Sequence, residues 1–496
     1  MPDSPPWASC HDVFDGVRVG ASALDGAVVL HPGVGGEKAE IRWRRIDDGW
    51  PVCRWGAGVT DGEQGDTEDR TVGRRLSDTG SATPVGAGRR GGVRDVFGVR
   101  NYRRFVAGQA LSLIGSWAET IALALLVLQL TRSALVLGLV MGTRYLPVLL
   151  ATPYAGLIVD RSNKRRVLTL TNAVLGLTSL AMGVSVLMGT VALWQIFVAA
   201  AVFGVMTALD NPARMALIPE LVDTHLLRSA ITVNSMMANV GRALGPAVAA
   251  GLIRWHGIGW CYLFNALTFA LVVVALAALD GRRLHRTVPA GRGKRQLREG
   301  LAVARSNRDI AGPLVMMAFV GTLTYEFETS LPVFAEQTLR AGVDGYAWLT
   351  TAFGVGSVLT GLLLARWPIT SLAPMIRVTV LYGAAMLSLT VSSGLPVALV
   401  SAGLVGGASI AFLTTGNSTI QLAAPPQMRG RVTGLWTTAF IGSTPIGALV
   451  IGAVAHRFGG HAGLAAGVIG CALAVLFGTI IHRRGDRQRT DGPNRR

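Results

Sequence analysis

Long apolar runs separated by short polar segments dominate the chain from Phe105 onward. Most runs hold about 20 residues, the length that a helix needs to cross a hydrocarbon core about 30 Å thick. Apolar and polar residues do not alternate strictly, so helices rather than barrel strands are expected to satisfy the backbone inside the membrane. The pattern predicts twelve transmembrane helices, near residues 105–130, 136–159, 167–188, 191–212, 229–254, 259–279, 310–334, 345–367, 373–392, 396–420, 432–455 and 461–482.

Basic residues gather in alternate loops between these runs. Four bases lie within 161–166 and nine within 282–308, whereas the loops on the other side carry single bases or none. Cytoplasmic loops of membrane proteins carry an excess of Lys and Arg. We therefore expect a multi-pass membrane protein with both termini in the cytoplasm.

The composition excludes several classes of protein. Half of the 496 residues are apolar and only 15% are charged, which is typical of a membrane protein. The formal net charge is +17, but the bases stand between apolar runs, which favours membrane topology over a nucleic-acid surface. The four cysteines lack metal-ligand spacing, and no nucleotide-binding or nucleophile motif stands in a credible context. We expect no enzyme activity, no metal, no cofactor and no nucleic-acid partner.

A basic stretch divides the apolar runs into two sets of six. Gly156–Arg161, at the end of the second run, recurs as Gly361–Arg366 at the end of the eighth. This recurrence indicates a parallel six-helix repeat. The predicted parts are an extension over 1–99, bundles over 100–280 and 310–482, a basic cytoplasmic linker over 281–309 and a basic cytoplasmic tail over 483–496.

The first 99 residues lack an apolar run long enough to span a membrane and lack a secretory signal. Gly, Asp and Arg recur there without periodicity, which predicts a disordered cytoplasmic extension. The alternative is an overlong start assignment, with the true start near Val93.

The second and third runs are joined by a motif that carries a family resemblance. Residues 156–166 read GLIVDRSNKRR, similar to the signature G-x-x-x-D-R-x-G-R-[KR] of the major facilitator superfamily. Asn163 replaces the second glycine, a mild change because Asn tolerates left-handed backbone. Residues 210–214 (DNPAR) and 429–432 (RGRV) further resemble the bacterial branch of enterobactin exporters and macrolide efflux pumps. The resemblance implies an all-α integral membrane fold, with twelve transmembrane helices in two pseudo-symmetric six-helix bundles.

The same resemblance implies a cytoplasmic gate that stabilises the outward-open state. In this gate, Asp160 would face the start of the eleventh apolar run and a partner residue in the fourth apolar run, such as Arg214. The alternative is a topology anchor, and Asp210 and Arg214 could also simply pair along one helix. The predicted gate residues are Gly156, Asp160, Arg161, Arg165, Asp210 and Arg214.

Gly241, Gly245 and Pro246 in the fifth run resemble the antiporter motif of drug exporters. Small residues at this spacing also let membrane helices approach closely, so packing alone is the alternative interpretation.

Five of the charged residues in the apolar runs lie deep in the membrane, and each costs roughly 2.5–3.5 kcal/mol on insertion scales. We predict that they line the proton-coupling and substrate cavity: Glu119, Arg144, Arg242, Glu326 and Glu328. Glu119 or one of the other two acids would exchange a proton, with static helix-orienting Glu–Arg pairs as the alternative. Glu326 and Glu328 are about 200° apart on a helix, so at most one should face a narrow cavity. Four aromatic residues could line a substrate wall or simply pack helices: Trp117, Tyr145, Phe327 and Trp436.

These observations favour a secondary exporter that moves an amphipathic drug-like or siderophore-like molecule outward by alternating access. The proton gradient would supply the energy, and the chain would act as a monomer in the lipid bilayer on a small-molecule substrate. One alternative is an importer or facilitator on the same fold. Another is a membrane scaffold or sensor that transports nothing.

Overall fold

The computed structural model describes residues 93–280, 302, 307–366, 370–425 and 428–490, together with four strands within 20–53. The chain forms two compact units, which are Met1–Ala87 and Gly88–Arg496.

Four short strands form an antiparallel sheet in the first unit, in sequence order. They are β1 (Gly20–Leu24), β2 (Ala27–His31), β3 (Ala39–Arg44) and β4 (Val52–Cys53). Gly20 pairs with His31, Ala27 with Arg42 and Trp43 with Cys53. The sequence interpretation did not include these strands, although an Asp-Gly pair between two apolar runs favours a hairpin. The rest of the predicted disordered extension, up to residue 92, lies outside the described residues.

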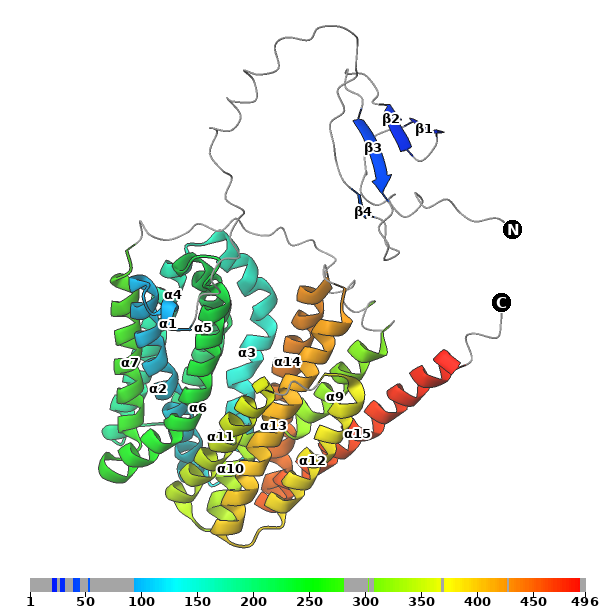
Figure 1. Cartoon of the computed structure of the whole chain (residues 1–496). Coiled ribbons are helices and arrows are strands. Elements are labelled where there is room, and N and C mark those ends of the chain that lie inside the picture. Colours follow the sequence, from blue (N-terminus) through cyan, green and yellow to red (C-terminus); the bar gives the residue numbers. More distant parts are fainter. Residues whose placement is uncertain are drawn as a thin grey trace. The chain divides into compact units, whose positions relative to one another are not determined.

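The second unit consists of helices (Figure 1). They are α1 (Val93–Val96), α2 (Arg100–Thr131), α3 (Ala134–Arg161), α4 (Lys164–Leu187), α5 (Leu193–Leu221), α6 (Leu227–His256), α7 (Gly259–Ala277), α9 (Arg308–Leu323), α10 (Phe327–Val333), the π-helix η3 (Phe334–Thr338), α11 (Gly342–Arg366), α12 (Leu372–Thr390), α13 (Leu395–Ala423), α14 (Arg429–Phe458) and α15 (Gly460–Thr490). Twelve segments of the described residues, with Arg308–Thr338 as one, are long and apolar enough to cross a membrane. This confirms the predicted twelve transmembrane helices.

The turn between α3 and α4 shows how the motif residues shape the backbone. Asn163 does not adopt the left-handed conformation, because its φ is −72° and its ψ is 109°. Its side-chain oxygen instead accepts a hydrogen bond from the backbone N–H of Arg166 at 3.3 Å. Asn163 is therefore the N-cap of α4, a position where Asn is among the most favourable residues.

Helices α2–α7 form one group and α9–α15 form the second, and matching helices make matching contacts. In the first group α3 packs on α5, α4 on α7 and α2 on α6; in the second, α11 packs on α13, α12 on α15 and α9 on α14. The groups meet through two equivalent pairs, α3 with α14 and α11 with α6. This pseudo-symmetry confirms the fold class expected from the sequence.

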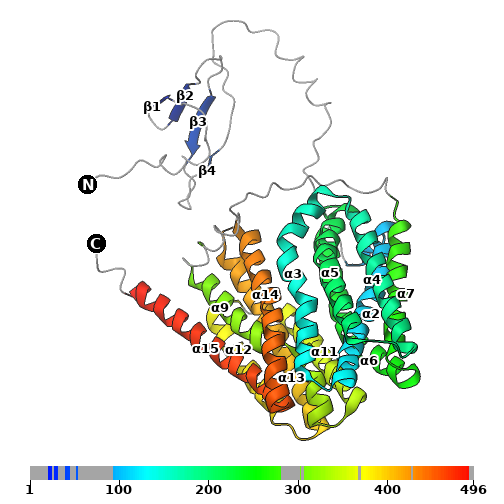
Figure 2. The ribbon, with the colours of Figure 1, turned by 180° about the vertical axis from the view of Figure 1, so that it is seen from behind.

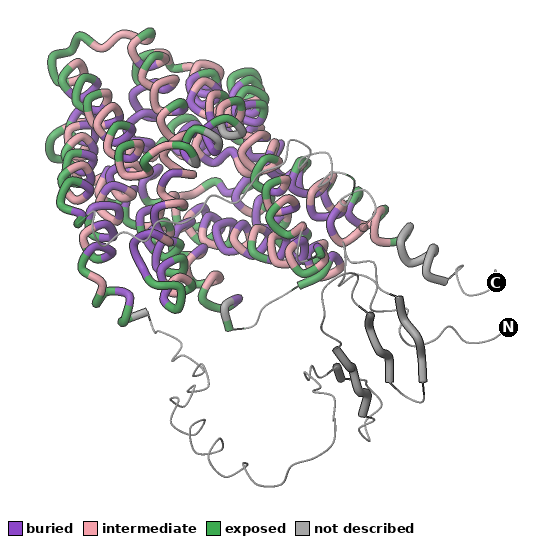
Figure 3. Tube along the Cα trace, turned by 90° about the horizontal axis from the view of Figure 1, so that it is seen from above, coloured by how far each residue is buried: buried purple, intermediate pink, exposed green. Residues whose placement is uncertain are grey.

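Buried and exposed residues both occur in the helix groups (Figure 3), although residues 118–128 of α2 are all buried. Large apolar side chains such as Leu177, Leu381 and Val400 are 66–68% exposed. Soluble proteins rarely expose apolar surface on this scale, so these faces are suited to contact lipid.

Among the described residues, the two groups approach closely at only one end. At Gly138 of α3 a Cβ atom would clash with the carbonyl oxygen of Ala448 in α14, and at Gly452 it would lie 2.8 Å from the carbonyl oxygen of Ala134. Near the other end of α14, Gly430 and Gly434 have no such neighbour within 4 Å. Helices α3 and α14 accordingly lie together at one end and diverge toward the end that carries the α3–α4 turn (Figures 1 and 2). We call the end with the α3–α4 turn the basic end and the other the opposite end.

Candidate functional site

The seventh transmembrane segment is interrupted between α9 and α10. Helix α9 ends at Leu323, and the Thr324 hydroxyl donates a hydrogen bond to the carbonyl oxygen of Gly467 at 2.8 Å. Glu326 has non-helical backbone angles, φ −85° and ψ 46°, and α10 begins only at Phe327. Discontinuous helices of this kind form the substrate sites of many secondary transporters.

A cavity of about 250 Å³ lies beside this interruption, between the two helix groups. Its wall is formed by α2, α3, α5 and α6 of the first group and by α10, α11, α14 and the interruption of the second. Much of the wall is aromatic, with rings that include Trp117, Tyr145, Phe327, Tyr346, Phe353 and Phe440. The cavity can therefore hold an apolar or aromatic small molecule.

Among the described residues, three charged side chains line this cavity: Arg242, Glu326 and Glu328. Both acids therefore face it, and the expectation that at most one would do so is wrong. The 200° separation assumed that both residues belong to one helix, whereas Glu326 precedes α10.

Glu328 is held by the first helix group. The phenolic hydroxyl of Tyr145 in α3 donates to its two carboxylate oxygens at 3.0 and 2.9 Å. This hydrogen bond crosses the cavity from one group to the other, and the sequence carries no signal that would pair these residues.

Glu326 has no comparable partner. Its side chain is 4% exposed, and no described residue forms a hydrogen bond with its Oε1 atom. A Cβ atom at Gly447 of α14 would clash with the backbone oxygen of Thr322 and lie 2.8 Å from Oε1 of Glu326, so the glycine lets α14 pack closely against the interruption and the carboxylate. Arg242 lies with its guanidinium carbon 5.1 Å from the ring centre of Trp117.

Glu119 and Arg144 do not line the cavity. The Glu119 carboxylate points into the first helix group, where its Oε2 atom accepts hydrogen bonds from Ser179 at 2.5 Å and Asn265 at 2.6 Å. Arg144 donates to the Thr120 hydroxyl at 3.1 Å, and its guanidinium carbon lies 3.7 Å from the ring centre of Phe203. Polar residues such as Ser179 and Asn265 inside apolar runs were the available signal for this network.

Of the four aromatic residues that could line a substrate wall, three line the cavity and one packs elsewhere. Trp117, Tyr145 and Phe327 line the cavity. Trp436 is 6% exposed and packs on Phe412, with ring centres 6.3 Å apart.

The glycines of the fifth transmembrane segment bring α6 against α2. A Cβ atom at Gly241 would lie 2.9 Å from the Cβ atom of Leu113, and one at Gly245 would clash with the Cβ atom of Trp117. Pro246 lines the cavity. The motif therefore places Trp117 beside the cavity through close packing.

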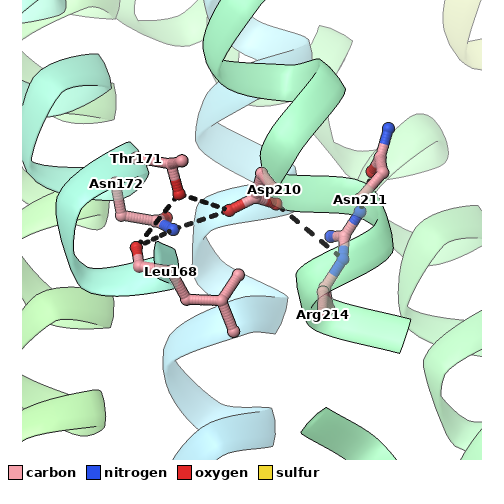
Figure 4. Close-up of polar contacts among 6 residues, drawn as sticks. All are labelled: Leu168, Thr171, Asn172, Asp210, Asn211 and Arg214. Atoms are coloured by element: carbon pink, nitrogen blue, oxygen red, sulfur yellow. Dashed lines mark hydrogen bonds and ion pairs between the residues drawn. The ribbon is translucent and has the colours of Figure 1, made fainter. Parts of the chain in front are cut away.

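Near the basic end, Asp210 of α5 is tied to α4 (Figure 4). Its Oδ1 atom accepts hydrogen bonds from Thr171 at 3.1 Å and Asn172 at 2.8 Å, and its Oδ2 atom lies 4.0 Å from the Nε atom of Arg214. Arg214 also donates to Asn211, which lines the cavity, at 2.5 Å. The alternative pairing of Asp210 with Arg214 along one helix is present in the structure.

The remaining gate candidates lie at the start of α4 and the end of α3. Arg165 donates to the carbonyl oxygens of Leu279 at 3.1 Å and Ala277 at 2.7 Å, where α7 ends. Cations at helix C-termini satisfy free carbonyls and favour the helix dipole. Gly156 is buried and Arg161 is exposed, while the side chain of Asp160 lies outside the described residues.

Lys164 forms an ion pair with Glu220 of α5 at 3.1 Å. Neither residue was predicted to have a partner. Together with Arg165, this pair attaches the start of α4 to the ends of α5 and α7.

Comparisons with known proteins find relatives of this chain among bacterial transporters. Macrolide efflux protein A of Streptococcus pyogenes is 23% identical over 75% of this chain and 93% of that protein. The enterobactin exporter EntS of Citrobacter koseri is 23% identical over 76% of this chain and 90% of that protein. The staphyloferrin A transporter of Staphylococcus aureus is 23% identical over 53% of this chain, and the match spans 66% of that protein, just under two thirds.

The fold is similar to that of a solved bacterial homologue of the human lysosomal transporter Spinster, in its inward-facing and unoccupied conformation. The TM-score is 0.63 at 14% identity, over 77% of this chain and 96% of that one. The family model described as transmembrane secretion effector matches residues 97–491. The resemblance to bacterial exporters is thereby confirmed, and the chain belongs to the transmembrane secretion effector family of the major facilitator superfamily, as a multi-pass membrane transporter.

Proposed function

We propose that this transporter exports an amphipathic small molecule across a bacterial inner membrane, by alternating access driven by protons that move inward. The observation that carries the proposal is the cavity between the two helix groups, with Glu326 and Glu328 in its wall. It combines a place for an organic molecule with groups that can bind and release protons.

Alternating access is supported by the uneven contact between the groups. They are in close contact at the opposite end, where small residues let α3 reach α14, and diverge at the basic end. If the basic end faces the cytoplasm, as the positive-inside tendency predicts, this conformation is open to the cytoplasm.

Polar contacts across the opposite end are weak enough to break during a cycle. Arg254 pairs with Asp344 at 3.4 Å, with side chains 70% and 53% exposed. Ser133 lies 3.4 Å from the His456 ring nitrogen. Exposed ion pairs contribute only about 0–1 kcal/mol, so packing of α3 on α14 is the main restraint on opening.

Proton exchange is better supported for the cavity acids than for Glu119. Glu326 and Glu328 can meet water from either side of the membrane as the cavity alternates. Glu119 is held by two donors of its own group, Ser179 and Asn265, and moves with them as one body. We assign proton exchange to the cavity pair and a structural role to Glu119.

The site is complete within one chain, which supports a monomer as the working unit.

At the basic end, Lys164 and Arg165 attach helices of one group to each other, which supports the role of topology anchors for these two residues. The latch proposed for Asp160 depends on a side chain outside the described residues.

Inverted membrane vesicles test this function. Respiration acidifies their lumen, and a fluorescent pH dye reports protons that leave it. The test panel contains a cation (ethidium), a neutral compound (chloramphenicol) and an anion (fluorescein). Export driven by protons requires at least one compound to accumulate in the vesicles while protons leave.

Accumulation that persists after nigericin collapses the pH gradient would contradict proton coupling. Uptake into intact cells only would favour the importer or facilitator. Binding without any flux in reconstituted liposomes would favour the scaffold or sensor.

A further inference from the structure

We propose that Glu326 binds the positive charge of the substrate, so that the transported molecules are amphipathic cations. This inference rests on the proposed function, because it names the substrate class of the same cavity.

The first observation is that Glu326 is the acid of the cavity wall that is left without a partner. Glu328 accepts the hydrogen bond of Tyr145. None of the ion pairs among the described residues involves Glu326, Glu328 or Arg242. Glu326 is 4% exposed, yet its Oε1 atom has no hydrogen-bond partner in the described part of the chain.

A buried carboxylate in this position is costly unless something neutralises it. A proton can do so while the cavity is empty, and the ammonium or heteroaromatic cation of a ligand can do so when the cavity is filled. Because Glu326 lines the cavity, a cationic ligand can there replace the proton that neutralises the carboxylate.

The surroundings of Glu326 suit a cation with an aromatic or apolar body. The Phe327 ring lies 5.8 Å from that of Tyr325 and 4.7 Å from that of Phe353, measured between ring centres. Aromatic faces attract cations and also contact apolar groups. The same wall thus accommodates both parts of an amphipathic cation.

An anionic substrate fits this wall less well. Arg242 is the one basic side chain that lines the cavity among the described residues, and its guanidinium already lies over the ring of Trp117. The two acids of the same wall would repel an anion. The charge of the wall thus favours cations over anions.

The test uses the purified full chain in lipid nanodiscs and a matched set of three-ring probes. N-methylacridinium is a fluorescent permanent cation, 9-methylanthracene is neutral, and anthracene-9-carboxylate is an anion. We expect saturable binding of the cation, with the anion bound at least about tenfold more weakly. The variant E326Q should weaken cation binding about tenfold or more, because one member of a buried charge pair is removed.

Two further variants separate charge from folding. E326D keeps the negative charge and should bind the cation more tightly than E326Q. Glu336 is an exposed acid of η3 that does not line the cavity, so E336Q should bind as the unchanged chain does.

The proposal is overturned if E326Q binds the cation as tightly as the unchanged chain, if the anion binds as tightly as the cation, or if the folded chain shows no saturable binding of the cation. The vesicle experiment tests the proposed function separately from the cation site. Proton-coupled export of only fluorescein would keep the function and refute the cation site, whereas cation binding at Glu326 without proton exchange would keep the site and refute the function.

Discussion

Tyr145 of α3 donates its phenolic hydrogen bond to the carboxylate of Glu328 in α10, at 3.0 and 2.9 Å from the two oxygens. The contact joins the two helix groups across the cavity. Both residues lie toward the opposite end, about 15 Å from the ends of their segments at a rise of 1.5 Å per residue. This hydrogen bond therefore adds to the packing of α3 on α14 as a restraint on opening toward the opposite end.

Replacing Tyr145 with Phe should shift the chain toward the conformation that is open at the opposite end. A hydrogen bond to a charged group contributes about 1.5–3 kcal/mol, so the populations should change about tenfold or more. Spin labels at Arg132 and Arg457, both exposed at the opposite end, would report a longer distance. Tyr154 lies on the same helix and is 70% exposed, so Y154F is the matched control. An unchanged distance distribution in Y145F would show that Tyr145 does not restrain opening.

A valine at Gly138 should act on the same closure through packing. Its side chain would collide with α14 at Ala448, and overpacking of this kind costs about 1–3 kcal/mol. We expect the groups to separate at the opposite end, measured as faster thiol labelling of a cysteine placed at Arg132. Gly430 has open space around its Cβ position, so G430V is the control. Equal labelling of both variants would argue against the α3–α14 contact as the closure.

A leucine at Gly245 should destabilise the first helix group. The new side chain would meet the Cβ atom of Trp117 and the backbone of Ile114 and Ala118 in α2, which cannot move without displacing the helix. We expect a thermal unfolding midpoint lower by several degrees, on the order of a 1–3 kcal/mol loss. At Gly251 of the same helix the nearest atom is 3.8 Å away on the Trp255 ring, so G251L should cost much less. Equal midpoints for the two variants would contradict the close contact between α2 and α6.

Replacing Glu119 with Gln should lower the stability of the fold and leave proton exchange unchanged. The amide oxygen can still accept the hydrogen bonds of Ser179 and Asn265, which both donate to Oε2, but these bonds lose the strength that the carboxylate charge gives them, and the amide NH2 takes the place of Oε1. Such a loss costs about 1–3 kcal/mol, visible as a lower unfolding midpoint. Proton release from inverted vesicles should continue once expression is matched. If proton release stops while the midpoint is unchanged, Glu119 is the coupling acid after all.

The transmembrane pattern could be predicted because it depends on composition over about 20 residues. The orientation of single residues could not be predicted, because the depth of a residue along a helix does not determine the direction in which its side chain points. Glu119 and Glu328 have similar predicted depths, yet Glu119 faces Ser179 inside one group and Glu328 faces Tyr145 across the cavity.

The interruption before α10 was also missed, for a physical reason. Helix breaks are usually recognised by Gly or Pro, and residues 324–326 are Thr, Tyr and Glu. The break is instead stabilised by tertiary contacts such as Thr324 with the carbonyl oxygen of Gly467. It places Glu326 on the cavity beside Glu328, which helical geometry alone would forbid.

The most direct measurement of the central claim compares proton release by the unchanged chain and by the double variant E326Q/E328Q in acidified inverted vesicles. Both are inserted to equal levels, and N-methylacridinium is added to each. The unchanged chain should take up the cation and release protons, while the double variant should do neither. Equal proton release by both proteins would contradict the assignment of coupling and substrate binding to the cavity between the two helix groups.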